Sequence, residues 1–247
     1  MSEDFVVFFD ANVIISASIF GHIGPLKQPA QHTHYATSCG VLNRLCTLQH
    51  NSAMPMIGYI SPTAESEARR EINNAIRSVL SRFWKEQKIS DEEKEKLADS
   101  IETFYSKSSR KLDEYLNILC REPPNLYSRD KIKMHIRREF DNLNPKTRIP
   151  KHNKFGDLLE KLDRIPFIQT QSYLPGIEET DLEILSDAYV VGKRLKKTTY
   201  LASLNTRHMA SKVAAKMLEE KFGLKVRLPE VILNTINKRF GHQDFAH

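Results

Sequence analysis

Residues 5–12 read FVVFFDAN, and this stretch decides the fold because an unbroken apolar run stops abruptly at a carboxylate. Five consecutive apolar residues are typical of a strand buried on both faces of a parallel sheet. An acid directly after such a strand lies at the carboxyl end of the sheet, where α/β proteins bind ligands. Asp10 is therefore the first candidate functional residue, and a simple turn-forming role is the alternative.

Strand-like and helix-like segments follow this opening in alternation. In the first part of the chain we expect helices at 12–19 and 36–50, a loop at 21–29, a strand at 56–60 and a helix that begins at 61–63. In the last part we expect strands at 167–169, 199–203 and 225–228, and helices at 178–192, 207–222 and 230–237. Such alternation predicts the α/β class, with a parallel sheet covered by helices on both faces.

The middle of the chain differs in character. Residues 90–93 have the spacing of a capping box and predict the start of a charged helix, which two consecutive prolines later break. A second, basic helix is expected at 130–140. We therefore expect an α/β domain formed by residues 1–88 and 160–247 and interrupted by a helical, basic insertion at 89–159.

Composition restricts the class of protein further. The chain has 247 residues, of which 40% are hydrophobic and 28% charged, as in folded globular proteins. No stretch is typical of a membrane segment, and acids on both sides of the apolar opening argue against a secretory signal. The three cysteines (Cys39, Cys46 and Cys120) form no CxxC pair, which argues against a zinc ribbon and favours a reducing cytoplasm.

Two further acids lie near the starts of expected helices. Glu67 belongs to the helix after the second strand, and Asp181 belongs to the helix at 178–192. The alternative for Glu67 is a solvated helical glutamate, and the alternative for Asp181 is an acid favoured by the helix dipole. Glu65 and Asp187 compete for these roles, but helical geometry turns them in other directions.

The segments that contain Asp10, Glu67 and Asp181 resemble, in this order, the motifs of the PIN-domain family of nucleases. These motifs are a strand ending in Asp-x-Asn, a Ser-Pro-led helix with an inward Glu, and a helix with the pattern x-x-Asp-x-x-x-Leu. The corresponding residues are 9–12, 61–67 and 179–185, and later family segments resemble residues 200–209 and 226–233. The resemblance covers roughly residues 4–75 and 165–240.

The resemblance implies an α/β/α sandwich with a flavodoxin-like parallel sheet, and hydrolysis of phosphodiester bonds with Mg²⁺ or Mn²⁺. It assigns Asp10, Glu67 and Asp181 as catalytic metal ligands. Asn12 and Ser16 would hold Asp10 or a water, although both residues are also suited to capping a helix. The residue types fit this chemistry, because clustered carboxylates repel one another without a cation and oxygen ligands select Mg²⁺ or Mn²⁺ over zinc.

One position departs from the family pattern. Asn205 stands where many members have a fourth acid, so it is a candidate metal ligand with less charge, or a turn former. The leading function is a metal-dependent endonuclease acting on RNA, with DNA as a further substrate class. The alternative is a catalytically weak PIN scaffold that binds RNA or a protein partner, and a homodimer is a further expectation from the family.

Positive charge is concentrated in the expected insertion. Residues 131–154 contain eight basic and two acidic residues, and the difference, eight minus two, equals the net charge of +6. We predict a nucleic-acid clamp, with a solvated charged face as the alternative. Its expected members are Lys133, Arg137, Arg138, Lys146, Arg148, Lys151 and Lys154. A second basic cluster at 193–197 lies at a helix C-terminus, where cations are favoured in any case.

Overall fold

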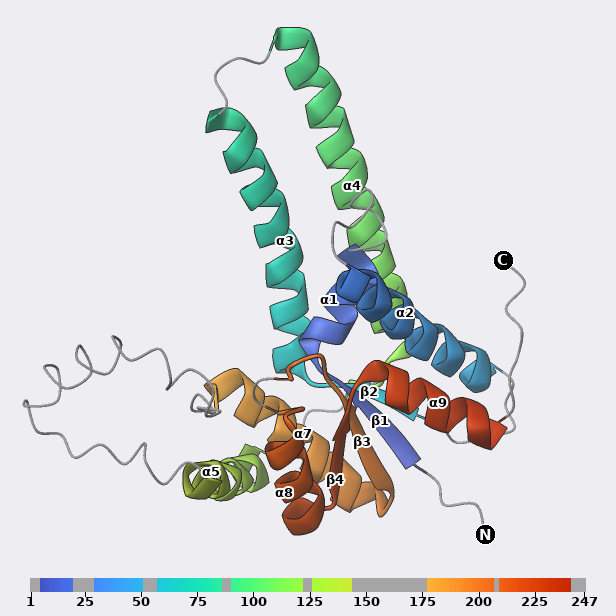
Figure 1. Cartoon of the computed structure of the whole chain (residues 1–247), viewed down its shortest axis with the longest axis vertical. Coiled ribbons are helices and arrows are strands. Elements are labelled where there is room, and N and C mark those ends of the chain that lie inside the picture. The colour runs from blue at the N-terminus through green and yellow to red at the C-terminus, as the bar shows by residue number, and fades with distance from the viewer. Residues whose placement is uncertain are drawn as a thin grey trace, which may run out of the picture.

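The computed structural model describes residues 5–19, 29–50, 57–85, 90–121, 126–143, 177–206 and 209–240, which contain four strands and eight helices (Figure 1). The strands are β1 (Phe5–Phe9), β2 (Ile57–Ile60), β3 (Thr198–Ala202) and β4 (Leu224–Arg227). The helices are α1 (Ala11–Ile19), α2 (Pro29–His50), α3 (Pro62–Lys85), α4 (Asp91–Ile118), α5 (Leu126–Leu143), α7 (Glu179–Leu195), α8 (Lys212–Phe222) and α9 (Pro229–Phe240).

The strands form one sheet in the order β2-β1-β3-β4, and every neighbouring pair is parallel. β1 lies inside the sheet, and all five of its residues are buried. Phe8 of β1 lies opposite Tyr59 of β2 and Leu201 of β3, which fixes the register. The predicted α/β class with a parallel sheet is confirmed. The unbroken apolar sequence of β1 follows from this position, because both faces of the strand are covered.

Helices cover the sheet on both sides, and the side changes where the strand order reverses. From β1 the chain crosses to β2 in one direction, whereas from β3 it crosses to β4 in the other. Right-handed crossovers therefore place α2 on one face and α7 and α8 on the other, and α9, which follows the last strand, packs against α2 (Figure 1). Tyr189 of α7 meets Phe222 of α8 with ring centroids 5.8 Å apart. The reversal lies between β1 and β3, which is where such folds bind ligands.

α3 and α4 form a long antiparallel pair that projects from the sheet (Figure 1). Directly after α4, Cys120 joins the outer edge of β2: its N–H donates to the Gly58 carbonyl at 2.8 Å, and its carbonyl accepts from Ile60 N at 3.2 Å. Leu116 near the end of α4 is fully buried. α4 therefore returns the chain to the sheet and shares its core. The predicted start of an insertion at residue 89 stays a prediction.

Element boundaries differ from expectation at several helix starts. α2 begins at Pro29, well before residue 36, because proline suits the first position of a helix. The prediction of a helix from residue 207 is wrong, since residues 209–211 form a turn. α8 begins after Ser211, whose Oγ accepts from Ala214 N at 3.3 Å. The expected strand at 167–169 lies outside the described residues.

None of the helices in the described part of the chain is both long enough and apolar enough to cross a bilayer. The most buried segment, β1, has five residues and belongs to the sheet.

Gly192 sets how closely α7 approaches β3. A Cβ atom at this position would overlap Thr199 Oγ1 and lie 3.0 Å from Thr199 Cβ. Both residues are buried, and the overlap with the Thr199 side chain requires the helix or the strand to shift. The glycine therefore allows the helix that carries Asp181 to lie directly on the central part of the sheet.

We predict that Gly192→Ala destabilises the fold by about 1–3 kcal/mol, the usual cost of overpacking. Thr199→Ala in the same chain should recover much of this loss, because it removes the overlapping hydroxyl. Urea unfolding of the two single variants and the double variant gives the coupling energy. Additive effects of the two substitutions would contradict the close contact.

Candidate functional site

Asp10 lies at the reversal of strand order, one residue beyond β1. Its N–H donates to the carbonyl of Ala202 at 3.0 Å, so the ladder between β1 and β3 continues to this residue. Its side chain is only 3% exposed. The ladder holds the carboxylate at the carboxyl edge of the sheet, the place expected from the sequence.

Two side chains orient the Asp10 carboxylate. Asn12 Nδ2 and Ser203 Oγ both donate to Asp10 Oδ2, each at 2.6 Å. Asn12 is itself held in place, because its Oδ1 accepts from Leu204 N at 2.9 Å. The two donors come from α1 and from the end of β3, so segments far apart in sequence meet at one carboxylate oxygen. Asn12 has the supporting contact expected of it.

A hydrogen-bonded chain continues from Asp10 to Asp181. Ser203 Oγ accepts from Asn205 N at 3.0 Å, and Asn205 Nδ2 donates to Asp181 Oδ2 at 3.1 Å. Asp181 is buried in the first turn of α7. In this orientation Asn205 acts as a donor that positions Asp181, rather than as an additional acid. The sequence did not identify Ser203 as a site residue, because it stands at the end of an expected strand.

Glu67 lies on the second turn of α3, whose start is capped by Ser61: the Ser61 Oγ accepts from Ala64 N at 3.0 Å. The half-buried Glu67 lines a hollow of about 390 Å³ between the starts of α3 and α7. Thr180, the neighbour of Asp181, forms part of the opposite wall. Glu65 instead turns toward Arg121, 2.7 Å away, outside this hollow.

The three acids influence one another electrostatically. Burial raises the pKa of Asp10 to about 7, the Ser203 hydrogen bond opposes the rise, and the charges of Asp181 and Glu67 add to it. Burial also raises the pKa of Glu67, and the next largest cause is the charge of Asp181. The carboxylates therefore share one electrostatic environment. As they stand, no three Asp, Glu, His or Cys side chains in the described ranges are grouped closely enough to hold a metal ion.

Ser16 does not make the contact expected of it. It is buried in α1, and its Oγ has no hydrogen-bond partner among the described residues. The donors to Asp10 are Asn12 and Ser203 instead. Ser16, one helical turn after Asn12, is therefore a buried packing residue of α1 in this structure.

The expected nucleic-acid clamp is described only in part. Lys133 of α5 forms ion pairs with Glu179 and Glu183 of α7, the latter at 3.3 Å. Arg137 also pairs with Glu179, whereas Arg138 is exposed. The other expected members lie outside the described residues: Lys146, Arg148, Lys151 and Lys154. Two of the three described members thus fasten α5 to α7.

An ion-pair network around the buried Asp187 joins α5 to both helices that carry the candidate acids. Arg129 Nε lies 3.0 Å from Asp187 Oδ1, and Arg129 Nη2 lies 3.1 Å from Glu183 Oε2. Arg129 also donates to Thr63 Oγ1 at 3.0 Å, and Thr63 donates to Glu183 at 2.7 Å. Burial raises the pKa of Asp187 to about 7, against the charge of Arg129. This network fixes the start of α3 relative to α7.

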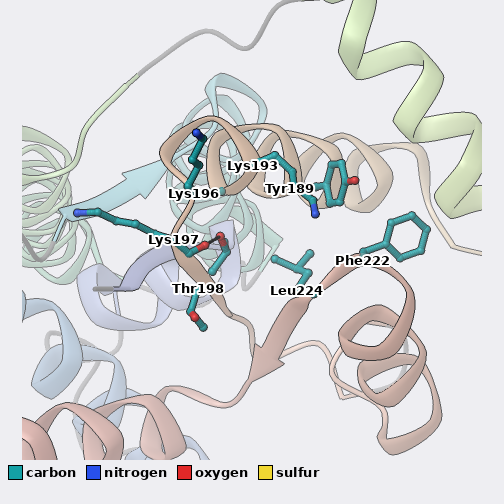
Figure 2. Close-up of a pocket in the computed structure, with 10 residues that line it drawn as sticks. Tyr189, Lys193, Lys196, Lys197, Thr198, Phe222 and Leu224 are labelled. Carbon is teal, nitrogen blue, oxygen red and sulfur yellow. Dashed lines mark hydrogen bonds between the residues drawn. The ribbon is translucent and has the colours of Figure 1, made fainter. Parts of the chain in front are cut away.

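A second hollow, of about 460 Å³, lies at the opposite end of the sheet, where β3 and β4 begin. It contains three members of the second basic cluster, Lys193, Lys196 and Lys197 (Figure 2). Figure 2 shows Lys196 and Lys197 pointing in different directions, and Lys193 Nζ lies 5.5 Å from the centroid of the Tyr189 ring. The lysines do not converge on one point, so this hollow is not a preformed anion site.

The chain was also compared with known proteins. No family model, curated protein or solved structure matches it. The side chains at the carboxyl edge of the sheet, above all Asp10, Asp181 and Glu67, are therefore the basis for inferring a function.

We predict that Arg129→Met destabilises the protein by about 1–3 kcal/mol at pH 8, because Asp187, with a pKa of about 7, is then mostly ionised and loses its cation. The loss should be smaller at pH 5, where Asp187 is protonated. Urea unfolding at both pH values measures this, with Arg138→Met, at an exposed position on the same helix, as the control. Equal losses from the two substitutions would contradict a buried pair.

A second prediction concerns Asp10. Since its folded pKa of about 7 exceeds the unfolded value, the native state binds more protons, and its stability declines as pH rises from about 4 to about 7. Asp10→Asn should therefore stabilise the metal-free protein at pH 8, by up to about 4 kcal/mol, and by much less at pH 4. The Asn oxygen still accepts from Asn12 and Ser203.

Thermal unfolding in EDTA at both pH values tests this prediction, with exposed Asp99→Asn as the control. Adding Mg²⁺ at pH 8 should raise the Tm of the wild-type protein and not that of Asp10→Asn, because a ligand of the folded state stabilises it. A variant less stable than the wild type at pH 8 would refute the electrostatic explanation.

Proposed function

We propose that this chain is a metal-dependent endonuclease that hydrolyses phosphodiester bonds, with RNA favoured over DNA. The observation that carries the proposal is the buried Asp10 carboxylate at the reversal of strand order, under the charges of Asp181 and Glu67. Acids that raise one another's pKa are unfavourable for the fold by themselves. A bound cation relieves that repulsion and makes their proximity favourable.

The donor set suits Mg²⁺ or Mn²⁺. Asp10, Asp181 and Glu67 offer only carboxylate oxygens, which these hard cations prefer. When bound, such an ion neutralises charge on a phosphate and lowers the pKa of a coordinated water. The three acids, in our proposal, hold the ion, and Asn205 contributes by directing Asp181 through its 3.1 Å hydrogen bond.

The remaining side chains of the site orient the acids. Asn12 and Ser203 hold one oxygen of Asp10, so the carboxylate cannot rotate without losing two hydrogen bonds. Ser203 also accepts from Asn205 N, which couples Asp10 to Asp181. Such fixed orientation favours catalysis because no reorganisation is required when the substrate binds.

We extend the proposal to membership of the PIN-domain family and to action in the cytoplasm. The parallel order β2-β1-β3-β4, with helices on both faces, is compatible with the flavodoxin-like three-layer α/β/α sandwich of that family. Asp10, Glu67 and Asp181 also come from the elements that the family pattern requires, namely the end of β1 and the starts of α3 and α7. The proposed nucleic-acid contacts are Arg138 and the expected loop residues Lys146, Arg148, Lys151 and Lys154.

A second candidate function is a catalytically weak scaffold that binds RNA or a protein partner. One observation favours it: Asn205 donates an N–H to Asp181, so the position of a fourth acid supplies neither charge nor a directed oxygen. The described residues also contain no ready-made group of three metal ligands. This candidate predicts binding without hydrolysis.

The central prediction is that the protein cleaves labelled RNA oligomers in Mn²⁺ or Mg²⁺ and that EDTA abolishes cleavage. Asp10→Asn should lower the rate by at least about 100-fold, the scale of losing one electrostatic or acid–base group. Gel analysis of RNA and DNA oligomers, with Asp99→Asn as a matched control, measures both effects.

The possible results separate the two candidates. Cleavage that survives EDTA or the Asp10 substitution would reject the carboxylate–metal mechanism. Tight RNA binding by a wild-type protein that cleaves neither substrate with either metal would favour the scaffold instead.

A further inference from the structure

The hollow beside Glu67 has the size and lining of a ligand subsite. Its volume of about 390 Å³ lies within the range of roughly 300–1,000 Å³ that is usual for ligand pockets. It opens between the first turns of α3 and α7, next to the Asp10–Asp181 network. Its lining residues are Pro62, Thr63, Ser66, Glu67, Arg70 and Thr180.

Arg70 is the cation of this hollow, and its neighbour Arg69 has another role. Arg69 faces α4, where its Nη1 lies 3.0 Å from Asp113 Oδ1. Arg70 lines the hollow, its side chain is 63% exposed, and its Nε lies 3.4 Å from Oε1 of the adjacent Glu71. Consecutive helical residues point about 100° apart, which explains how two neighbouring arginines serve different faces.

The chemistry of the lining suits a phosphodiester. A guanidinium offers several N–H donors in one plane, which match phosphate oxygens. The hydroxyls of Ser66 and Thr180 supply further donors from the two facing helices. Thr63 is engaged with Arg129 and Glu183, so it forms a fixed wall rather than a ligand. Glu67 in the same wall repels an anion unless a cation sits at the acids, so the phosphate and the metal would bind together.

We propose that this hollow binds the phosphate of the substrate strand next to the scissile one, with Arg70 as its contact. The inference rests on the proposed nuclease function and names a substrate-binding residue for it. The strand then passes from the Asp10 carboxylate along the first turns of α3, where that helix leaves the sheet (Figure 1). Arg70 sets where the strand lies and does not act on the bond that breaks.

The test compares Arg70→Gln with Arg69→Gln, two substitutions of the same type at adjacent exposed positions. Binding of a short fluorescent single-stranded RNA is measured over a KCl series with Asp10 intact and Ca²⁺ in place of Mg²⁺, so that the acids can hold a cation. Gel analysis of the same samples verifies that the RNA stays uncleaved. Loss of one phosphate contact should flatten the slope of log affinity against log salt by about 0.7 and weaken binding about fourfold at roughly 0.15 M salt.

Arg69→Gln should leave the slope unchanged, and Arg70→Lys should retain it because the charge remains. In the cleavage-competent protein, Arg70→Gln should raise KM about fourfold and change kcat by less than about twofold, the pattern of lost ground-state binding. Thermal unfolding of each variant verifies that the fold is intact.

The outcomes separate this inference from the proposed function. Metal-dependent cleavage by the wild type, with equal salt slopes for Arg69→Gln and Arg70→Gln, would overturn the phosphate subsite and leave the nuclease standing. A selective effect of Arg70→Gln on RNA binding, in a protein that never cleaves, would support the subsite and remove the nuclease. A fall in kcat at unchanged KM would also overturn it, since the effect would then lie in the reaction step.

Discussion

The structure depends on one constraint, a carboxylate buried at the carboxyl edge of the sheet. Asp10 is 3% exposed and follows a strand with no exposed residue, so bulk water solvates its charge poorly. Burial of a charge in such surroundings costs free energy unless partners compensate it. Two hydrogen bonds to one oxygen provide part of this compensation, and the charges of Asp181 and Glu67 work against it. Asp10 therefore does not favour the stability of the fold, a situation that is common at functional sites.

α7 is the element through which the rest of the fold supports this carboxylate. Its first turn carries Asp181, which reaches Asp10 through Asn205 and Ser203. Its middle carries Asp187, which pairs with Arg129 of α5, and its last turns lie on β3 at Gly192. A shift of α7 therefore disturbs an ion pair, a packing contact and the candidate site together. The position of Asp181 is consequently more strictly fixed than that of an acid on an isolated helix.

The sequence predicts those features that depend on local pattern. The apolar run before Asp10 predicts a doubly covered strand, and helix-start signals place Glu67 and Asp181 near the same edge. Ser203 has no such signal, because only the register between β1 and β3 brings its hydroxyl to Asp10. The pairing of Arg129 with Asp187 is equally invisible, since it depends on how α5 docks on α7. Charge counting likewise groups Lys133 with a nucleic-acid surface, whereas tertiary contacts give it two acidic partners in α7.

A comparison of the two most perturbed acids explains why the ligand-binding role is assigned to Asp10. Asp10 and Asp187 are both buried, and burial raises the pKa of each to about 7. For Asp187 the main opposing influence is the guanidinium of Arg129, which comes from within the fold. For Asp10 the main opposing influence on the pKa is the neutral hydroxyl of Ser203, and the strongest charges acting on it are those of two more acids. The fold places the cation of Arg129 beside Asp187 and further acids beside Asp10, so the two sites differ in kind. The first has its counter-charge within the fold, whereas the second has further acids as its charged neighbours, which is why we propose that a cation from solution binds there.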